Sequence, residues 1–197
     1  KEIINDDAIK FAVIGLGKFG GREIGYGSDL DIIFVYSAPS SVCHSCMSLA
    51  GIQSSPSDMN IKEEAGFPLK NVAGMTESEI LQYIFRLCEK IINIASEMTE
   101  EGILYKIDPR LRPLGKDGPL AMDIDAYKRY FMEWAQLWER QAYIKARYIA
   151  GDAELADNFI KLTHGFVYSS PITDDDVAEI GRIRNRMINE LIEPLNK

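Results

Sequence analysis

Two apolar runs near the N-terminus, separated by a short glycine-rich segment, constrain the fold most strongly. Phe11 to Leu16 and Leu30 to Tyr36 are dominated by apolar residues, the pattern of strands buried on both faces of a sheet. The 13 residues between the two runs include five glycines, which leaves room for at most two helical turns. We therefore expect two buried strands joined by a short connection.

The glycine turn reads Gly15-Leu16-Gly17-Lys18-Phe19-Gly20, which matches the spacing of a dinucleotide-binding fingerprint. That fold needs a full crossover helix and an acid about 20 residues further on, whereas the next strand here already begins at Leu30. A Walker A loop is excluded as well, because no Gly-Lys-Ser or Gly-Lys-Thr occurs. Two interpretations stay open, a purely structural turn and a turn whose amides approach a phosphate, with Lys18 and Ser28 nearby.

Three aspartates suggest a metal site. Asp29 and Asp31 stand two apart at the start of the second strand, so alternation points both carboxylates to one face. Their repulsion is costly unless a cation lies between them, and such oxygen ligands suit magnesium or manganese. A solvated strand end is the alternative for this pair alone. Asp108 ends a further expected strand before Pro109. If that strand lies beside the second one, Asp108 joins the other two acids, and three converging carboxylates can hold two divalent ions and orient a phosphoryl displacement.

Basic residues stand close to this acidic group. Arg110 and Arg112 directly follow Asp108, and guanidinium groups bind phosphate oxygens well. Further along, we expect one helix over residues 133–149, with Arg140 and Arg147 on a common face, and ion pairs with acids as the alternative role for both.

The rest of the chain predicts helices with two short strands among them. Thr76 and Glu79 form a capping-box pattern, so a helix should begin there and pack on the sheet. Residues 37–75 show no periodicity and are expected to be a long loop or insertion. We expect a domain over 1–152 and the start of a helical domain over 153–197. The other expected elements are strands at 104–108 and 119–122 and helices at 125–132, 153–162 and 174–191.

The cysteines, two further groups of aspartates and the tryptophans are assigned structural roles and not functional ones. Cys43 and Cys46 with one histidine leave a zinc site incomplete, and three cysteines in all fit a reducing compartment. Asp123-Ile124-Asp125 and Asp174-Asp175-Asp176 precede or open helices, where acids cap free amides. Trp134 and Trp138, one helical turn apart, are expected in the core.

Charge and hydropathy exclude two classes of partner. Lys and Arg total 22 against 30 for Asp and Glu, and the formal charge of −8 disfavours binding along a nucleic-acid backbone. No apolar run approaches the length of a membrane span, and no signal peptide is recognisable, so we expect no membrane contact and a cytoplasmic location. The chain begins at Lys1 without a methionine, and we expect it to be a piece of a longer protein.

Four motifs follow one another along the chain. They are Gly15-Leu16-Gly17-Lys18-Phe19-Gly20-Gly21-Arg22-Glu23, Ser28-Asp29-Leu30-Asp31, Asp108-Pro109-Arg110-Leu111-Arg112-Pro113 and Trp138-Glu139-Arg140-Gln141-Ala142-Tyr143-Ile144-Lys145-Ala146-Arg147. Together they resemble the nucleotidyltransferase domain of the bacterial glutamine synthetase adenylyltransferase family, also called glutamate-ammonia-ligase adenylyltransferase. The resemblance covers about residues 11–152.

This resemblance implies a fold and a set of site residues. The fold is that of the DNA polymerase β superfamily, an α+β sheet with flanking helices, followed by the start of an α-helical bundle. The catalytic, metal-binding acids implied are Asp29, Asp31 and Asp108. Together with Arg110 and Arg112, the residues expected near the nucleotide phosphates are Gly17, Lys18 and Ser28.

It also implies an activity and partners. The reaction is adenylyl transfer from ATP to a tyrosine of glutamine synthetase, or removal of that AMP by phosphate, with Mg²⁺ or Mn²⁺ and under regulation by PII protein. Of the two directions we favour removal, on the similarity of residues 117–120 and 138–147 to that half of the family, whereas residues 25–31 and 102–105 look closer to the half that adds AMP. A related nucleotidyltransferase such as a PII uridylyltransferase, and a catalytically silent regulatory binding module, stay open as alternatives.

Overall fold

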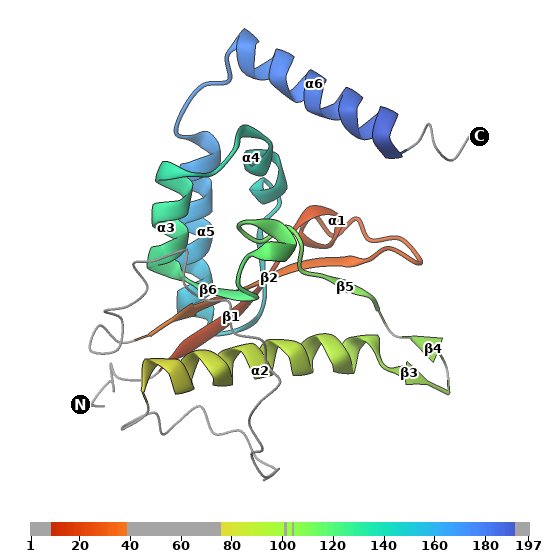
Figure 1. Ribbon diagram of the computed structural model, residues 1–197, viewed down its shortest axis with the longest axis vertical. Helices are drawn as coiled ribbons and strands as arrows, with labels where there is room; N and C mark the ends of the chain where they lie inside the picture. The colour runs from red at the N-terminus through yellow and green to blue at the C-terminus, as the bar shows by residue number, and fades with distance from the viewer. Residues whose placement is uncertain (1–8, 39–75, 101, 104, 192–197) are drawn as a thin grey trace.

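The structure, a computed structural model, describes residues 9–38, 76–100, 102–103 and 105–191. Almost all of the expected loop over 37–75 lies outside these ranges. Cys43 and Cys46 lie there too, so their expected lack of a metal stays a prediction. Within the described ranges the chain combines one main sheet with flanking helices, which confirms the predicted α+β class (Figure 1).

The two apolar runs form the centre of the sheet, as predicted. Strand β1 (Lys10–Gly15) and strand β2 (Leu30–Ser37) pair in antiparallel fashion, with Lys10 opposite Ser37 and Gly15 opposite Ile32. Between them the chain makes one four-residue helix, α1 (Gly17–Gly20). The absence of a crossover helix between β1 and β2 confirms that the glycine spacing does not belong to a dinucleotide-binding fold.

Three further strands complete the sheet. Strand β7 (Arg147–Gly151) pairs antiparallel with the outer edge of β1. On the far edge of β2 lie two short parallel strands, β5 (Ile107–Asp108) beside its beginning and β6 (Ala121–Asp123) beside its end. The strand order is therefore β5, β2, β1, β7, with β6 also bonded to β2.

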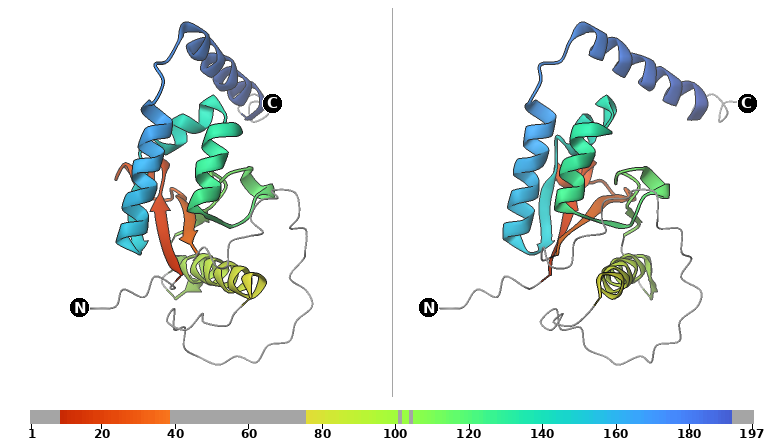
Figure 2. Two further views of the ribbon diagram at one scale, coloured as in Figure 1. Left: turned by 90° about the vertical axis from the view of Figure 1, so that its left-hand side faces the viewer. Right: turned by 60° about the vertical axis from the view of Figure 1, so that its left-hand side comes forward.

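Helices pack on both faces of the sheet, and alternate side chains of each strand point to the helices on one face and then on the other. Helix α2 (Glu77–Ser96), capped by Thr76 in the predicted capping box, packs on the face that carries Phe34. Helices α3 (Ile124–Glu133), α4 (Leu137–Tyr143) and α5 (Ala153–Tyr168) pack on the opposite face. Figure 2 shows the sheet between these two layers.

The expected helix over 133–149 is wrong in its second half. Helix α4 ends at Tyr143, and residues 147–151 form β7 instead. The outer edge of β1 needs a hydrogen-bonding partner, and the pairing of β7 supplies it against the local helical pattern. The expected strand over 104–108 is also too long, because Tyr105 donates its amide to Ala95 at the end of α2. Before it, β3 (Met98–Thr99) and β4 (Gly102–Ile103) form a small separate hairpin.

Two expectations about single residue types have opposite outcomes. The prediction that Trp134 and Trp138 lie in the core is wrong, because 60% and 40% of their surfaces are exposed. The capping role of Asp123 is confirmed: its carboxylate accepts a hydrogen bond from the amide of Asp125 at the start of α3. Asp176 likewise accepts from the Thr173 amide at 2.8 Å.

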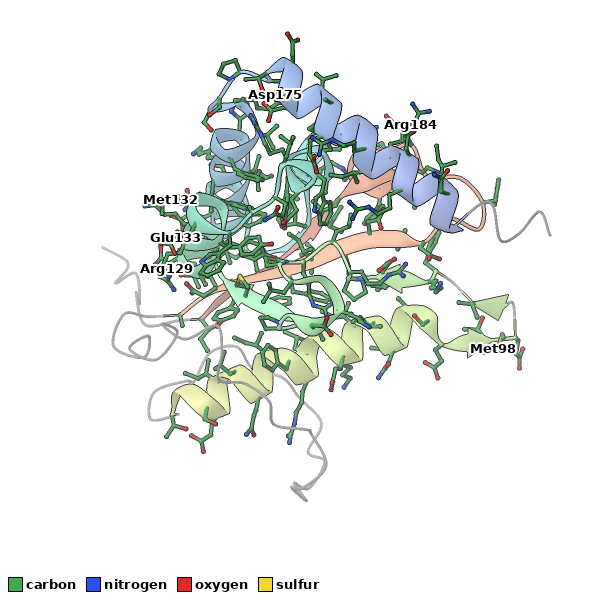
Figure 3. The ribbon with its side chains drawn as sticks, turned by 45° about the horizontal axis from the view of Figure 1, so that its top comes forward. Met98, Arg129, Met132, Glu133, Asp175 and Arg184 are labelled. Carbon is green, nitrogen blue, oxygen red and sulfur yellow. The ribbon has the colours of Figure 1, made fainter. Side chains whose placement is uncertain are left out.

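Helix α5 belongs to the core on its face of the sheet. Phe159 is fully buried and packs edge-on against Tyr127 of α3, with ring centroids 4.8 Å apart. The division at residue 152 stays a prediction, but a cut there would expose this face. The last helix, α6 (Asp174–Leu191), packs against α4 and lies on the side of the molecule opposite α2 (Figure 3). No helix among the described residues combines the length and apolarity that crossing a bilayer requires.

We predict that Phe159→Ala lowers the free energy of unfolding by about 3–5 kcal/mol, because it opens a cavity among fully buried rings. Urea unfolding followed by circular dichroism measures the loss. Ile172→Ala is the control, since Ile172 is 61% exposed and its truncation should change stability by less than about 0.5 kcal/mol. Equal stability of the two variants would contradict the assignment of α5 to this core.

Candidate functional site

The candidate site lies where β5 joins the beginning of β2. In this parallel pair Leu30 is opposite Ile107 and Asp31 is opposite Asp108. Residues that pair directly across two strands project to the same face, so both carboxylates lie on one side of the sheet. Asp29 stands two residues before Asp31. The structure thus brings together the three acids that the sequence singled out.

The three acids differ in their partners. Lys106 donates to Asp29 at 3.1 Å, and the Arg110 guanidinium binds both oxygens of Asp108, with Nε at 2.8 and 2.9 Å. Among the described residues Asp31 has no ion pair of this kind. Burial, with the negative charges of Asp108 and then Asp29, raises the pKa of Asp31, while the bonds from Arg110 lower the pKa of Asp108. Asp31 is therefore the acid of this group that has no cation bonded to it in the ion pairs of the described residues.

Helix α1 packs directly against Asp31. The Leu16 amide donates to the Asp31 carbonyl at 2.9 Å. At Gly17, whose φ is +50°, a Cβ atom would lie 2.5 Å from an Asp31 carboxylate oxygen, so only glycine fits. The positive charge of Lys18 acts to lower the Asp31 pKa, which places this ammonium within electrostatic reach of the carboxylate. The glycine turn, which the sequence predicts to approach phosphate, thus lies directly against one of the three acids.

Of the remaining predicted phosphate ligands, Ser28 lies in the turn just before Asp29, where its amide donates to the Gly25 carbonyl at 3.1 Å. Arg110 is exposed and engaged by Asp108. Arg112 has a different environment: it donates to the carbonyls of Pro109, Lys116 and Gly118. These bonds close the loop that contains the short helix η1 (Gly115–Asp117). Arg112 therefore stabilises the loop that follows Asp108.

The expectation that Arg140 and Arg147 share one helical face is wrong, since one lies in α4 and the other in β7. Neither contacts an acid in the ion pairs of the described residues. Arg140 donates to the carbonyls of Val167 and Ser170 at the end of α5. Arg147 donates to the carbonyls of Phe19 and Gly20 at the end of α1. This contact could not be predicted from the sequence, because it depends on β7 being a strand.

Asp29, Asp31 and Asp108 are of the chemical type that magnesium and manganese ions prefer as ligands. All three are carboxylates, and mutual repulsion at Asp31 is the condition that a divalent cation relieves. Their side chains do not yet surround one point: within the described ranges no three acids, histidines or cysteines are gathered closely enough to hold an ion. Two of the three carboxylates are instead bonded to cations of the chain, Asp29 to Lys106 and Asp108 to Arg110.

Comparison with known proteins gives one consistent result. The family described as glutamate-ammonia ligase adenylyltransferase matches residues 2–53 and 64–162. A protein of Streptomyces avermitilis is 32% identical over 185 residues, which are 93% of this chain and 15% of that protein. One of Psychromonas ingrahamii is 37% identical over 157 residues, 80% of this chain and 14% of that protein.

Both relatives bear the name bifunctional glutamine synthetase adenylyltransferase/adenylyl-removing enzyme, as does a protein of Vibrio parahaemolyticus that is 35% identical over 92% of this chain. The chain spans about 14–16% of the length of these three relatives.

We predict that Gly17→Ala destabilises the chain more than Gly27→Ala. Both glycines have positive φ, +50° and +78°, so each alanine costs about 1–2 kcal/mol of backbone strain. Only at Gly17 does the new Cβ also collide with Asp31, whereas nothing lies within 4 Å at Gly27. Chemical unfolding of both variants measures the difference, and equal losses would show that α1 does not press on Asp31.

We predict that Asp31→Asn stabilises the metal-free chain at neutral pH. Because the folded state raises the Asp31 pKa, ionisation of this carboxyl disfavours folding at pH values above the folded pKa. That penalty disappears below the ordinary value of 3.8, where Asp31 is protonated in both states. Melting temperatures measured with a chelator from pH 3 to 8 should therefore diverge as the pH rises. Identical curves for wild type and variant would contradict the assignment.

Proposed function

The chain belongs to the glutamate-ammonia ligase adenylyltransferase family, and from that premise we propose that it is a nucleotidyltransferase unit acting on glutamine synthetase. AMP would pass between ATP and a tyrosine hydroxyl of that enzyme. The observation that carries the proposal is the pairing of Asp31 with Asp108 across two parallel strands, with the glycine turn packed against the Asp31 carboxylate.

In this proposal Asp29, Asp31 and Asp108 hold Mg²⁺ or Mn²⁺. The ions would polarise the α-phosphate and neutralise charge that faces the attacking oxygen. Asp31 is the ligand whose negative charge is least compensated in the protein itself, so it gains most from an ion. Asp108 must exchange its Arg110 partner for the ion, which leaves the guanidinium free to bind phosphate oxygens.

The nucleotide phosphates would lie over the glycine turn. Gly17 has no side chain to obstruct an approach, and the exposed Lys18 offers an ammonium beside Asp31. Ser28 adds a hydroxyl from the segment that leads into β2. Arg112 contributes by stabilising the loop after Asp108, and we assign it this supporting role because three backbone carbonyls occupy its guanidinium.

Two directions of transfer are compatible with these groups. In the first, the tyrosine oxygen loses its proton and bonds to the α-phosphorus of ATP, and pyrophosphate leaves. In the second, an oxygen of inorganic phosphate bonds to the phosphorus of adenylyl-tyrosine, which yields ADP and restores the tyrosine hydroxyl. The motif similarities favour removal. Cations such as Arg110 suit either inorganic phosphate or the outer phosphates of ATP.

The other partners are proposed on narrower grounds. The proposal that PII protein is a partner rests on the resemblance of motifs alone. A PII uridylyltransferase with the same metal chemistry differs in the base of its nucleotide, so a preference for UTP over ATP would identify it. A silent binding module would carry the fold and bind glutamine synthetase without any transfer.

We predict that Asp31→Asn and Asp108→Asn each lower transfer by at least about 100-fold, because each removes charge stabilisation at the reacting phosphate. One assay supplies glutamine synthetase, radiolabelled ATP and MgCl₂, and a second supplies adenylylated glutamine synthetase and phosphate. Labelled tyrosine in the first or ADP in the second identifies the direction.

Asp157→Asn is the matched control, since Asp157 is an exposed acid on α5 paired only with Lys161 among the ion pairs described. It should retain full activity. Unchanged transfer by Asp31→Asn would refute the metal assignment. A wild-type chain that is folded but inactive in both assays, with either ATP or UTP, would support the silent module instead.

A further inference from the structure

Helix α1 cannot maintain its own conformation. It has four residues, a single turn, and forming one turn in isolation is unfavourable because many dihedral angles are fixed for very few hydrogen bonds. Leu16 precedes it and provides no side-chain cap. The position of this turn must therefore come from contacts with other elements.

Besides its packing on β2 and β1, this turn receives two side-chain hydrogen bonds from Arg147 in β7. Its Nε donates to the Gly20 carbonyl at 2.9 Å and its Nη2 to the Phe19 carbonyl at 2.8 Å. The guanidinium also lies over the Phe19 ring, 5.5 Å from its centre. Carbonyls at a helix end lack partners within the helix, and a planar guanidinium can bind two of them at once.

The strand pairing fixes where this guanidinium lies. Arg147 is opposite Gly15 in the β1–β7 ladder, only two residues before α1 begins. Next to it, the Lys145 ammonium pairs with Glu23 at 2.6 Å. The approach is close: a Cβ on Gly20 would lie 2.0 Å from the Lys145 carbonyl oxygen. The C-terminal side of the turn is thus packed against the segment 145–147.

The opposite side of the same turn contacts the site. The Leu16 amide binds the Asp31 carbonyl, and Gly17 lies against the Asp31 carboxylate. Since α1 is a single turn held between these two sets of contacts, we expect a displacement at Phe19 and Gly20 to displace Gly17 and Lys18 as well. The distance between Lys18 and Asp31 therefore depends on bonds made by a residue of β7.

We propose that Arg147 is a positioning residue for nucleotide binding, which sets the place of Gly17 and Lys18 beside Asp31 through its two bonds to α1. Arg147 itself touches neither the acids nor, in this proposal, the nucleotide. The consequence for nucleotide affinity rests on the proposed function, whereas the effect on α1 does not.

The test compares Arg147→Met with Arg140→Met in the purified chain. Both substitutions remove one guanidinium that binds two backbone carbonyls, but Arg140 binds the end of α5 and not α1. Titration calorimetry with ATP and MgCl₂ measures the affinity for the nucleotide. Titration with Mn²⁺ in the absence of nucleotide measures the affinity of the three acids for the ion. The rate of amide hydrogen exchange in residues 15–23 measures how well the turn is ordered.

We expect Arg147→Met to weaken ATP binding by at least about tenfold, since two charge-assisted bonds that order the turn are lost. Mn²⁺ affinity should stay unchanged, and the amides of Gly20 and Gly21 should exchange faster. Arg140→Met should leave all three readouts at wild-type values. Arg147→Lys keeps a positively charged donor but loses the planar guanidinium that binds two carbonyls at once, so this variant should bind ATP with intermediate affinity.

Wild-type ATP affinity in Arg147→Met, or unchanged exchange in residues 15–23, would overturn the inference, as would an equal loss of affinity in Arg140→Met. If Arg147→Met does not fold, Arg147→Lys decides the question by the same criteria. Failure of the wild-type chain to bind ATP would instead overturn the proposed function, and the inference about nucleotide affinity with it.

Discussion

Strand β2 is the element on which the rest of the structure depends, because both of its edges are hydrogen bonded. All of β1 pairs with one edge of β2, and β5 and β6 pair with the other edge. Pairing with β5 brings Asp108 beside Asp31 across 77 residues of sequence. Pairing with β6 ends at Asp123, which caps α3 and so starts the helical layer. One strand thus organises the site and part of the core.

The centre of the fold could be predicted because its signals are local. The two apolar runs, the glycines between them and the capping box at Thr76 each act over a few residues, and the structure confirms all three. Strand β7 could not be predicted in this way. Its residues continue a helical pattern, and only the unfilled edge of β1 gives them a reason to extend. The same reason explains why Trp138 is half exposed on a short helix and not buried in a long one.

The acids of the candidate site were predictable in part. The two-residue spacing predicts that Asp29 and Asp31 lie on the same face. Asp108 joins them only if its strand lies beside β2, and the sequence alone does not determine that strand order. The engagement of Arg112 by three carbonyls was not visible, because it depends on how the loop after Pro109 closes. Glu139 was missed for a similar reason: it is a buried carboxylate satisfied by the Tyr130 hydroxyl, a contact across the corner between α3 and α4.

The pairing of Arg110 with Asp108 has a consequence for the folding of the site. A cluster of acids that relied on divalent ions for neutrality would repel itself until an ion arrived. Here Lys106 and Arg110, two residues before and two residues after Asp108, balance two of the three charges. The β2–β5 pair therefore forms with two of its three acids already bonded to cations of the chain itself. In the proposed function, a divalent ion would then be needed for the reaction and not for the assembly of the sheet.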